Sequence, residues 1–179
     1  MISQGHPHSH LKSLDIEKCS EFESFPNEGL FAPQLYRLSI KGMEKLKSLP
    51  ERMPALLPSL NNLSIGGFAG VEFSDGCLPP NIKFMNLFNC SKLAASLKGA
   101  LGANSSLQIL SISDVDVESF PDEGLLPLSL TELSIYDSPN LMKLDYRGHL
   151  SPLLSSEIGS VGLPQPPMLA RGGSARIHF

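Results

Sequence analysis

A group of apolar residues recurs every 22 to 25 residues along this chain, and no other feature constrains its fold as strongly. Each unit carries the spacing Leu-x-x-Leu-x-Ile or a close variant, and a further apolar residue usually follows three positions later. The segment SFPNEGL at 24–30 also returns as SFPDEGL at 119–125. A fixed period of roughly 20–50 residues indicates a repeat architecture, in which each repeat is one supersecondary unit. The units begin near Leu11, Leu35, Leu60, Ile82, Leu107 and Leu130, which gives steps of 24, 25, 22, 25 and 23 residues.

Each unit predicts a short β-strand around its Leu-x-Ile segment. Side chains alternate across a strand, so the two apolar residues point to one face and their neighbours to the other. No unit can bury its leucines alone, and stability therefore depends on stacking against neighbouring units. Pro and Gly between the units indicate irregular return segments, with one or two helical turns expected at 94–102. The sequence thus predicts an α/β-type solenoid, a leucine-rich-repeat horseshoe segment with a parallel β-sheet on its concave face and a mostly irregular convex side.

The repeat frame divides the chain into three parts. Residues 1–10 form a flexible, polar lead, residues 11–150 carry the six leucine-rich repeats, and residues 151–179 lose the frame. Gly, Pro and Ser dominate this last part, which predicts a disordered tail. Neither end of the repeats has a recognisable cap, and a solenoid needs caps for solubility. This suggests a piece of a longer parent protein.

Composition argues against several classes of function. The 179 residues carry a net charge of −4 and a pI near 5.7, without the basic stripe of a nucleic-acid-binding protein. No apolar run is long enough for a membrane span. Cys19 and Cys90 share a repeat position that holds apolar residues in most other units, which indicates buried thiols rather than metal ligands. The alternating His6, His8 and His10 are a compositional hint of metal binding, but a polar lead is the preferred interpretation. No Ser, His and Asp arrangement marks a catalytic elbow, so neither an enzyme nor a metal site is expected.

The units with Leu-x-x-Leu-x-Ile-x-x-Cys, followed by SFPNEGL or SFPDEGL, resemble the leucine-rich repeats of one class of plant disease-resistance proteins. This is the coiled-coil, nucleotide-binding, leucine-rich-repeat (NB-LRR) class, and LMKLDYRGHLSPL at 141–153 also resembles one of its late repeats. The resemblance covers about residues 11–150. It implies a cytoplasmic immune receptor whose repeats recognise pathogen effectors or guarded host proteins and help to hold the receptor inactive. The family's coiled coil and its phosphate-binding GxxxxGK[ST] loop are missing here, so ADP or ATP is expected only in the nucleotide-binding domain of a parent protein.

The outward strand positions define the surface on which a partner is expected to bind. Their middle column reads Asp, Ser, Ser, Asn, Ser, Ser, and these short polar residues predict a flat, accessible floor. Large apolar groups stand beside it in the later units, and clustered exposed apolar or aromatic groups mark interaction sites. The predicted partner-binding residues are Arg37, Lys41, Phe84, Phe88, Ile109 and Tyr136.

Two other interpretations of these residues stay open. Phe84 and Phe88 can fold over the rim or contact further repeats, and a register slip by one residue would turn them inward. Arg37 and Lys41 can belong to an ordinary solvated face, where exposed ion pairs contribute only about 0–1 kcal/mol.

Taken with the resemblance, these features predict a protein-recognition module of a plant intracellular immune receptor, located in the cytoplasm. The expected partner is a protein: a pathogen effector, a guarded host protein or the parent's own nucleotide-binding domain, with no nucleic acid or membrane involved. An intramolecular, autoinhibitory segment and a non-functional truncated fragment remain alternatives. An extracellular receptor is disfavoured because no signal peptide precedes the glycosylation sequons at Asn62, Asn89 and Asn104.

Overall fold

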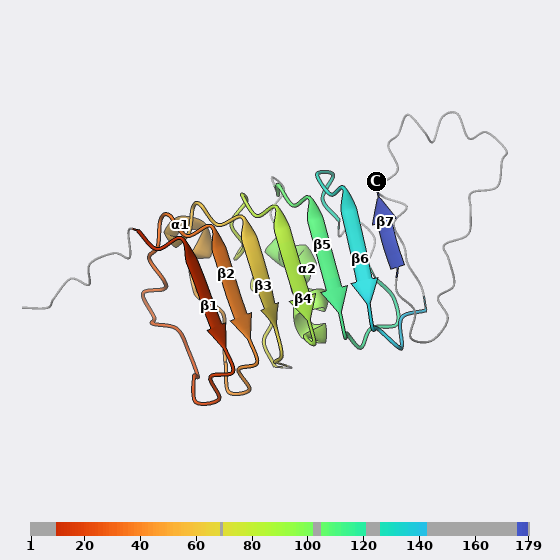
Figure 1. The fold of residues 1–179 in the computed structure, drawn as a ribbon, viewed down its shortest axis with the longest axis horizontal. Coiled ribbons are helices and arrows are strands. Elements are labelled where there is room, and N and C mark those ends of the chain that lie inside the picture. The colour runs from red at the N-terminus through yellow and green to blue at the C-terminus, as the bar shows by residue number, and fades with distance from the viewer. Residues whose placement is uncertain (1–9, 69, 102–104, 121–125, 143–174, 179) are drawn as a thin grey trace, which may run out of the picture.

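The computed structural model describes residues 10–68, 70–101, 105–120, 126–142 and 175–178. Within these ranges the chain forms a seven-stranded sheet in the order β1-β2-β3-β4-β5-β6-β7, with two helices on one side of it (Figure 1). The strands are β1 (Ser13–Glu17), β2 (Arg37–Lys41), β3 (Asn62–Gly66), β4 (Phe84–Phe88), β5 (Ile109–Ser113), β6 (Glu132–Tyr136) and β7 (Ala175–His178). The helices are α1 (Met53–Leu56) and α2 (Ser91–Ala100).

The first six strands are parallel, and each pairs with the next one in the chain. Ser13 pairs with Arg37, Arg37 with Asn62 and Asn62 with Phe84, so the register follows the sequence repeat. The fold is therefore α/β, and its mostly parallel sheet contains one strand from each sequence unit. A register slip that turns Phe84 inward does not occur.

The inward residues of the strands form two stacked rows at the centre of the core. Leu38 and Ile40 are fully buried in β2, whereas the equivalent Leu14 and Ile16 in the outermost strand β1 are only half-buried. Full burial of one such side chain contributes about 1.5–3 kcal/mol. One row is Leu14, Leu38, Leu63, Met85, Leu110 and Leu133, and the other is Ile16, Ile40, Ile65, Leu87, Ile112 and Ile135.

The two cysteines at equivalent repeat positions differ in burial, because they lie in different places along the row of repeat units. Cys90 is buried as predicted, but Cys19 is exposed. Cys19 follows β1, which has no neighbouring strand on its outer side in the described chain. The repeat position predicts burial only where units lie on both sides.

A left-handed residue follows each of the six parallel strands. After each of β1–β5, the amide of this residue donates to the carbonyl oxygen of the last residue of the next strand, for example from Asn89 to Ser113 at 2.9 Å. Glycine adopts positive φ freely, and Asn and Asp tolerate it better than other residues. Five of the six positions have one of these types, and Lys18 is the exception with φ of 54°. The six residues are Lys18, Gly42, Gly67, Asn89, Asp114 and Asp137.

The return segments contain more helix than the sequence predicts. Helix α2 begins at Ser91 rather than near residue 94, because Leu93, Ala94, Leu97 and Ala100 form one apolar face against the core. The single turn of α1 was not predicted, and Pro54 lies in its first turn, where proline is tolerated. None of the helices in the described ranges has the length and apolar character needed to span a membrane.

The end of the chain departs from the predicted disorder. Most of the predicted lead (residues 1–9) and most of the predicted tail (residues 151–174 and 179) lie outside the described residues, as do residues 143–150. Ala175–His178 instead form β7, which pairs antiparallel with β6 and places Ile177 beside Leu133. Ile177 packs against the core, and the Arg176 Nη2 atom lies 2.9 Å from the Glu132 carboxylate. Four residues are too short a pattern for a strand to be predicted from alternation alone.

Candidate functional site

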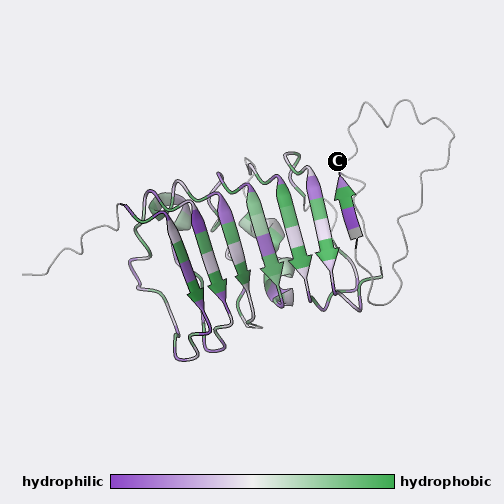
Figure 2. Cartoon of the chain, viewed as in Figure 1, coloured by the Kyte–Doolittle hydropathy of each residue, from purple (hydrophilic) through white to green (hydrophobic). Residues whose placement is uncertain are grey.

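The strand register sets three rows of outward residues across β1–β6. Figure 2 shows hydrophobic (green) and hydrophilic (purple) bands along these strands. Neighbouring strands lie about 4.8 Å apart, so each row brings residues from different units side by side. The first row is Ser13, Arg37, Asn62, Phe84, Ile109 and Glu132; the middle row is Asp15, Ser39, Ser64, Asn86, Ser111 and Ser134; the third row is Glu17, Lys41, Gly66, Phe88, Ser113 and Tyr136.

The predicted apolar residues occupy the face in two separate places. Phe84 is 40% exposed and pairs in register with the half-buried Ile109 in the first row. Phe88 and Tyr136 lie in the third row, separated by Ser113. Phe88 is half-buried because its ring lies across Gly66 of β3, where an added Cβ would come within 2.7 Å of two ring atoms. Phe84 is thus the most exposed of the four and the best-placed apolar anchor.

The two predicted cations differ in their surroundings. The Lys41 ammonium lies 3.2 Å from the Glu17 carboxylate on the neighbouring strand. Arg37, which is exposed, makes no ion pair or side-chain hydrogen bond within the described part of the chain. The Glu17 carboxylate therefore balances the charge of Lys41, whereas the guanidinium of Arg37 is available to bind an anion.

The middle row is not the flat, accessible floor that the sequence predicts. Asp15 and Asn86 are exposed, but Ser39, Ser64 and Ser134 are buried. A serine side chain extends only one heavy atom beyond Cβ, so longer side chains on the same face can cover it. The Ser39 hydroxyl is buried without a hydrogen-bond partner among the described residues.

A fourth row, which the sequence did not predict, lies at the amino ends of the strands. Each member precedes its strand, and backbone hydrogen bonds join the row, as from the Tyr36 amide to the Lys12 carbonyl oxygen at 2.9 Å. Lys12, Tyr36 and Lys83 are exposed, with Tyr36 at 47%. In the sequence, this row corresponds to the residue that directly follows the first Leu of each Leu-x-x-Leu spacing. That residue precedes the strand and yet lies at the surface in several units. This row, the amino rim, is Lys12, Tyr36, Asn61, Lys83, Gln108 and Thr131.

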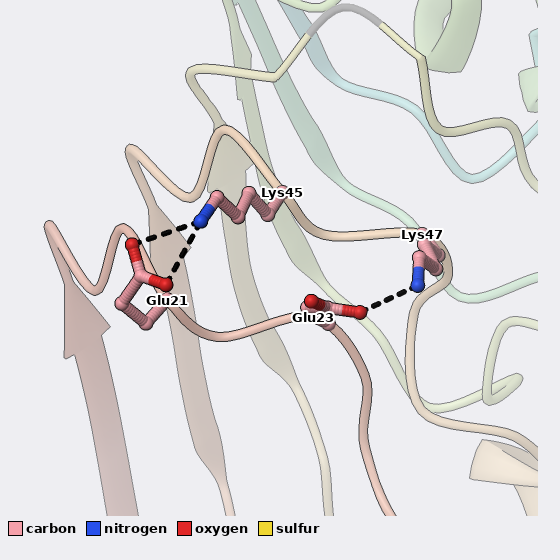
Figure 3. A network of polar contacts seen from close by, with 4 residues as sticks. All are labelled: Glu21, Glu23, Lys45 and Lys47. Atoms are coloured by element: carbon pink, nitrogen blue, oxygen red, sulfur yellow. Dashed lines mark hydrogen bonds and ion pairs between the residues drawn. The ribbon is translucent and has the colours of Figure 1, made fainter.

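Ion pairs at the opposite, carboxyl end join the first two units (Figure 3). Lys45 lies 2.8 Å from the Glu21 carboxylate, and Lys47 pairs with Glu23. The hydrogen bond and charge of Lys47 lower the pKa of the Glu23 carboxyl. These pairs are exposed, so water and salt screen them and they contribute little to stability. Their main effect is that carboxylates neutralise the positive charges of the two lysines that follow β2.

A hollow of about 520 Å³ lies away from the outward rows, on the loops that surround α1 and precede β4. Its lining includes Glu51, Arg52, Glu72, Asp75 and Cys77. Burial raises the pKa of the Cys77 thiol, which makes it a poor nucleophile. No group of three potential metal ligands occurs within the described ranges.

Two of the predicted sequons fall on described residues. Asn62 is half-buried on β3, and Asn89 is exposed after β4. Asn104 lies outside the described residues.

Comparison with known proteins gives partial matches. A protein of Arabidopsis thaliana described as a disease resistance protein, At3g14460, is 36% identical over 126 residues, which are 69% of this chain and 9% of that protein. TMV resistance protein N of Nicotiana glutinosa is 26% identical over 164 residues, covering 76% of this chain and 14% of its own length. A protein of Anthopleura elegantissima described as a glycoprotein hormone G-protein coupled receptor is 32% identical over 138 residues, covering 75% of this chain and 14% of its own.

No protein-family model matches the chain. No solved structure matches it either. The chain spans only 9% to 14% of the length of the three relatives. Two of these three proteins are plant resistance proteins, in agreement with the resemblance carried by the repeats. The chain is therefore homologous to plant disease resistance proteins over a short part of their length.

Proposed function

We propose that this chain is a leucine-rich-repeat solenoid segment that binds proteins through its outward sheet face. The observation that carries the proposal is Phe84, which is 40% exposed in the first row of that face beside Ile109. An exposed aromatic group on a rigid sheet is a favourable anchor for a partner. The strands hold the face at fixed spacing, so binding would require little reordering of the backbone.

The biological setting that we propose is plant immunity. Two homologues carry names that refer to disease resistance. In this proposal the segment belongs to a cytoplasmic receptor of the NB-LRR class, and it recognises a pathogen effector or a guarded host protein. It performs no catalysis and holds no cofactor, and nucleotide binding is left to other parts of the receptor.

A second candidate is intramolecular regulation. The relatives are far longer than the matched region, so another part of such a protein is available to cover the outward face. A segment that clamps a nucleotide-binding domain would use the same exposed residues. The two candidates differ only in the identity of the bound protein.

Site-specific photo-crosslinking in plant cells tests the proposal. A photoreactive residue at position 84 is compared with one at Ala95, which is exposed on α2 away from the outward rows. Each crosslinked protein is identified by mass spectrometry, produced in pure form and titrated by calorimetry against the full chain and its Phe84→Ser variant. The proposal predicts a product specific to position 84 and at least tenfold weaker binding by the variant. Equal products at both positions, or unchanged affinity, would refute it.

The identity of the crosslinked protein separates the two candidates. A nucleotide-binding domain of a plant receptor would assign the segment to intramolecular regulation. A pathogen protein or another host protein would assign it to recognition.

A further inference from the structure

The cations near the two ends of the sheet differ in how many of them form ion pairs. Lys41, Lys45 and Lys47, at the carboxyl end of β2 and beyond, each have an acidic partner. Lys12 and Lys83 on the amino rim, like Arg37 beside it, have no ion pair within the described part of the chain. Three of the described cations without an ion pair thus lie together at the amino end of the sheet, whereas Lys18 and Arg52, which also lack one, lie elsewhere and apart from each other.

No carboxylate in that part of the face balances these cations. The amino rim and first row of β1–β4 comprise Lys12, Ser13, Tyr36, Arg37, Asn61, Asn62, Lys83 and Phe84, with three cations and no acid. Asp15 lies one row further along β1 and forms no ion pair with any of them. Glu132 lies two strands beyond Phe84 and already contacts Arg176 at 2.9 Å. The local charge is positive, although the chain carries −4 overall.

Exposed aromatic side chains lie among the same cations. Tyr36 precedes Arg37 and is 47% exposed, and Phe84 follows Lys83 and is 40% exposed. The backbone joins them through Asn61, whose amide donates to the Tyr36 carbonyl oxygen at 3.1 Å and whose carbonyl accepts from the Phe84 amide at 3.0 Å. We call Lys12, Tyr36, Arg37, Lys83 and Phe84 the basic–aromatic strip.

We propose that the basic–aromatic strip binds an acidic, extended segment of the partner protein, with apolar side chains between its carboxylates. This inference rests on the proposed function and specifies the partner's chemistry. Arg37 lies on β2 and Lys83 directly precedes β4, two strands or about 10 Å apart. An extended chain in the polyproline II conformation rises about 3.1 Å per residue with three residues per turn, so its side chains three residues apart lie on one side. Carboxylates roughly three residues apart would therefore reach both cations, and an intervening apolar side chain would lie near Tyr36 or Phe84.

Fluorescence anisotropy with a defined probe tests the inference on the full chain. The probe is a fluorescein-labelled peptide with glutamate at every third position and leucine or phenylalanine between. A peptide with glutamine in place of glutamate is the neutral probe, and single-stranded oligothymidine is the nucleic-acid probe. We expect binding of the acidic peptide that weakens as salt rises, and at least tenfold weaker binding of the other two probes.

Matched charge reversals locate the binding. Arg37→Glu and Lys83→Glu should each weaken binding of the acidic peptide by at least tenfold, and Arg37→Gln by a smaller factor. Lys18→Glu makes the same charge change at an exposed, unpaired lysine at the carboxyl end of β1, and it should change binding by less than about twofold. Circular dichroism melts verify that each variant is folded.

Several outcomes would overturn the inference: equal binding of the neutral peptide, equal losses at Lys18 and Arg37, or tighter binding of oligothymidine. The crosslinking experiment at position 84 keeps this failure separate from failure of the proposed function. A partner captured through position 84 whose affinity is unchanged by Arg37→Glu would retain the protein-binding function and reject the acidic segment.

Discussion

The Phe88 ring lies across Gly66 of the neighbouring strand, so a Cβ atom on Gly66 would lie 2.7 Å from the Cγ and Cδ1 atoms of Phe88. The same Cβ would lie 1.9 Å from the Phe88 backbone oxygen, which cannot move without disturbing the end of β4. Gly66 is therefore required by the close approach of its neighbour.

Replacement of Gly66 by alanine should destabilise the sheet. Overpacking in a well-packed region costs about 1–3 kcal/mol, and we expect a loss of that size in the free energy of unfolding. Gly70→Ala is the control, because nothing lies within 4 Å of a Cβ placed there. Urea unfolding of both variants measures the difference. Equal midpoints for the two variants would show that β4 does not approach Gly66 so closely.

Two buried serines of the middle row should respond in opposite ways to alanine. The Ser39 hydroxyl is buried without a partner, and such a group costs about 1–3 kcal/mol, so Ser39→Ala should be neutral or stabilising. The Ser134 hydroxyl donates to Glu132 Oε1 at 3.1 Å and accepts from Arg176 Nε at 3.3 Å. Ser134→Ala should cost about 0.5–1.5 kcal/mol. Chemical denaturation checks the order, and a larger loss for Ser39→Ala would contradict it.

The sheet and its register could be predicted from the sequence because burial imposes a strict alternation. Leu38 and Ile40 must face the core, and that fixes Arg37, Ser39 and Lys41 on the other face. The same logic fails where burial depends on neighbours rather than on alternation. Cys19 has the same repeat position as Cys90 and yet is exposed, because β1 is the outermost strand.

The candidate site was predicted only in part, because the sequence shows neither which charged side chains form ion pairs nor which residues outside the strands reach the surface. The positions of Phe84 and Ile109 on the face follow from alternation, but the ion pair between Lys41 and Glu17 depends on side-chain conformations that spacing does not fix. Tyr36 was overlooked because residues before a strand have no fixed side in a two-residue period. Only the three-dimensional structure therefore distinguishes the cations that form ion pairs from those that form none.

Lys18 is the one non-Gly, non-Asn, non-Asp residue in the left-handed position that follows each parallel strand. A left-handed conformation costs an ordinary L-residue roughly 1–2 kcal/mol, and asparagine tolerates it better. Lys18→Asn should therefore raise the free energy of unfolding by about 0.5–1 kcal/mol. Lys12→Asn is a control, since it removes the same charge at the other end of β1. A lower midpoint for Lys18→Asn than for the parent chain would contradict the prediction.

The Cys90 thiol makes stability dependent on alkaline pH. Burial raises its pKa from 9.0 to about 12. Below pH 9 both the folded and the unfolded chain keep the proton, so this group contributes no pH dependence. Between pH 9 and 12 only the unfolded chain loses it, and stability should fall by up to about 1.4 kcal/mol per pH unit.

Urea unfolding midpoints at pH 8 and pH 10.5 measure this effect. At pH 8 the thiol keeps its proton in both the folded and the unfolded chain, whereas at pH 10.5 only the folded chain keeps it. Cys90→Ala should lower stability at both values but reduce the difference between them, because the titrating group is gone. Cys19→Ala is the matched control at an exposed thiol and should leave the difference unchanged. An identical pH difference in all three proteins would exclude Cys90 as the cause.

Strand β7 closes the edge of the sheet that β6 would otherwise expose, and unpaired edges invite association with other chains. Ile177 is half-buried beside Leu133, so Ile177→Asp places a charge against the core and should detach β7. We expect the backbone amides of β6 to exchange with deuterium at least tenfold faster in this variant, while those of β2 keep their protection. His178→Ala is the control, because the His178 imidazole is exposed and lies 3.8 Å from Glu132. Unchanged protection of β6 in Ile177→Asp would mean that β6 is stable without its antiparallel neighbour, and the sheet would then rest on the parallel strands alone.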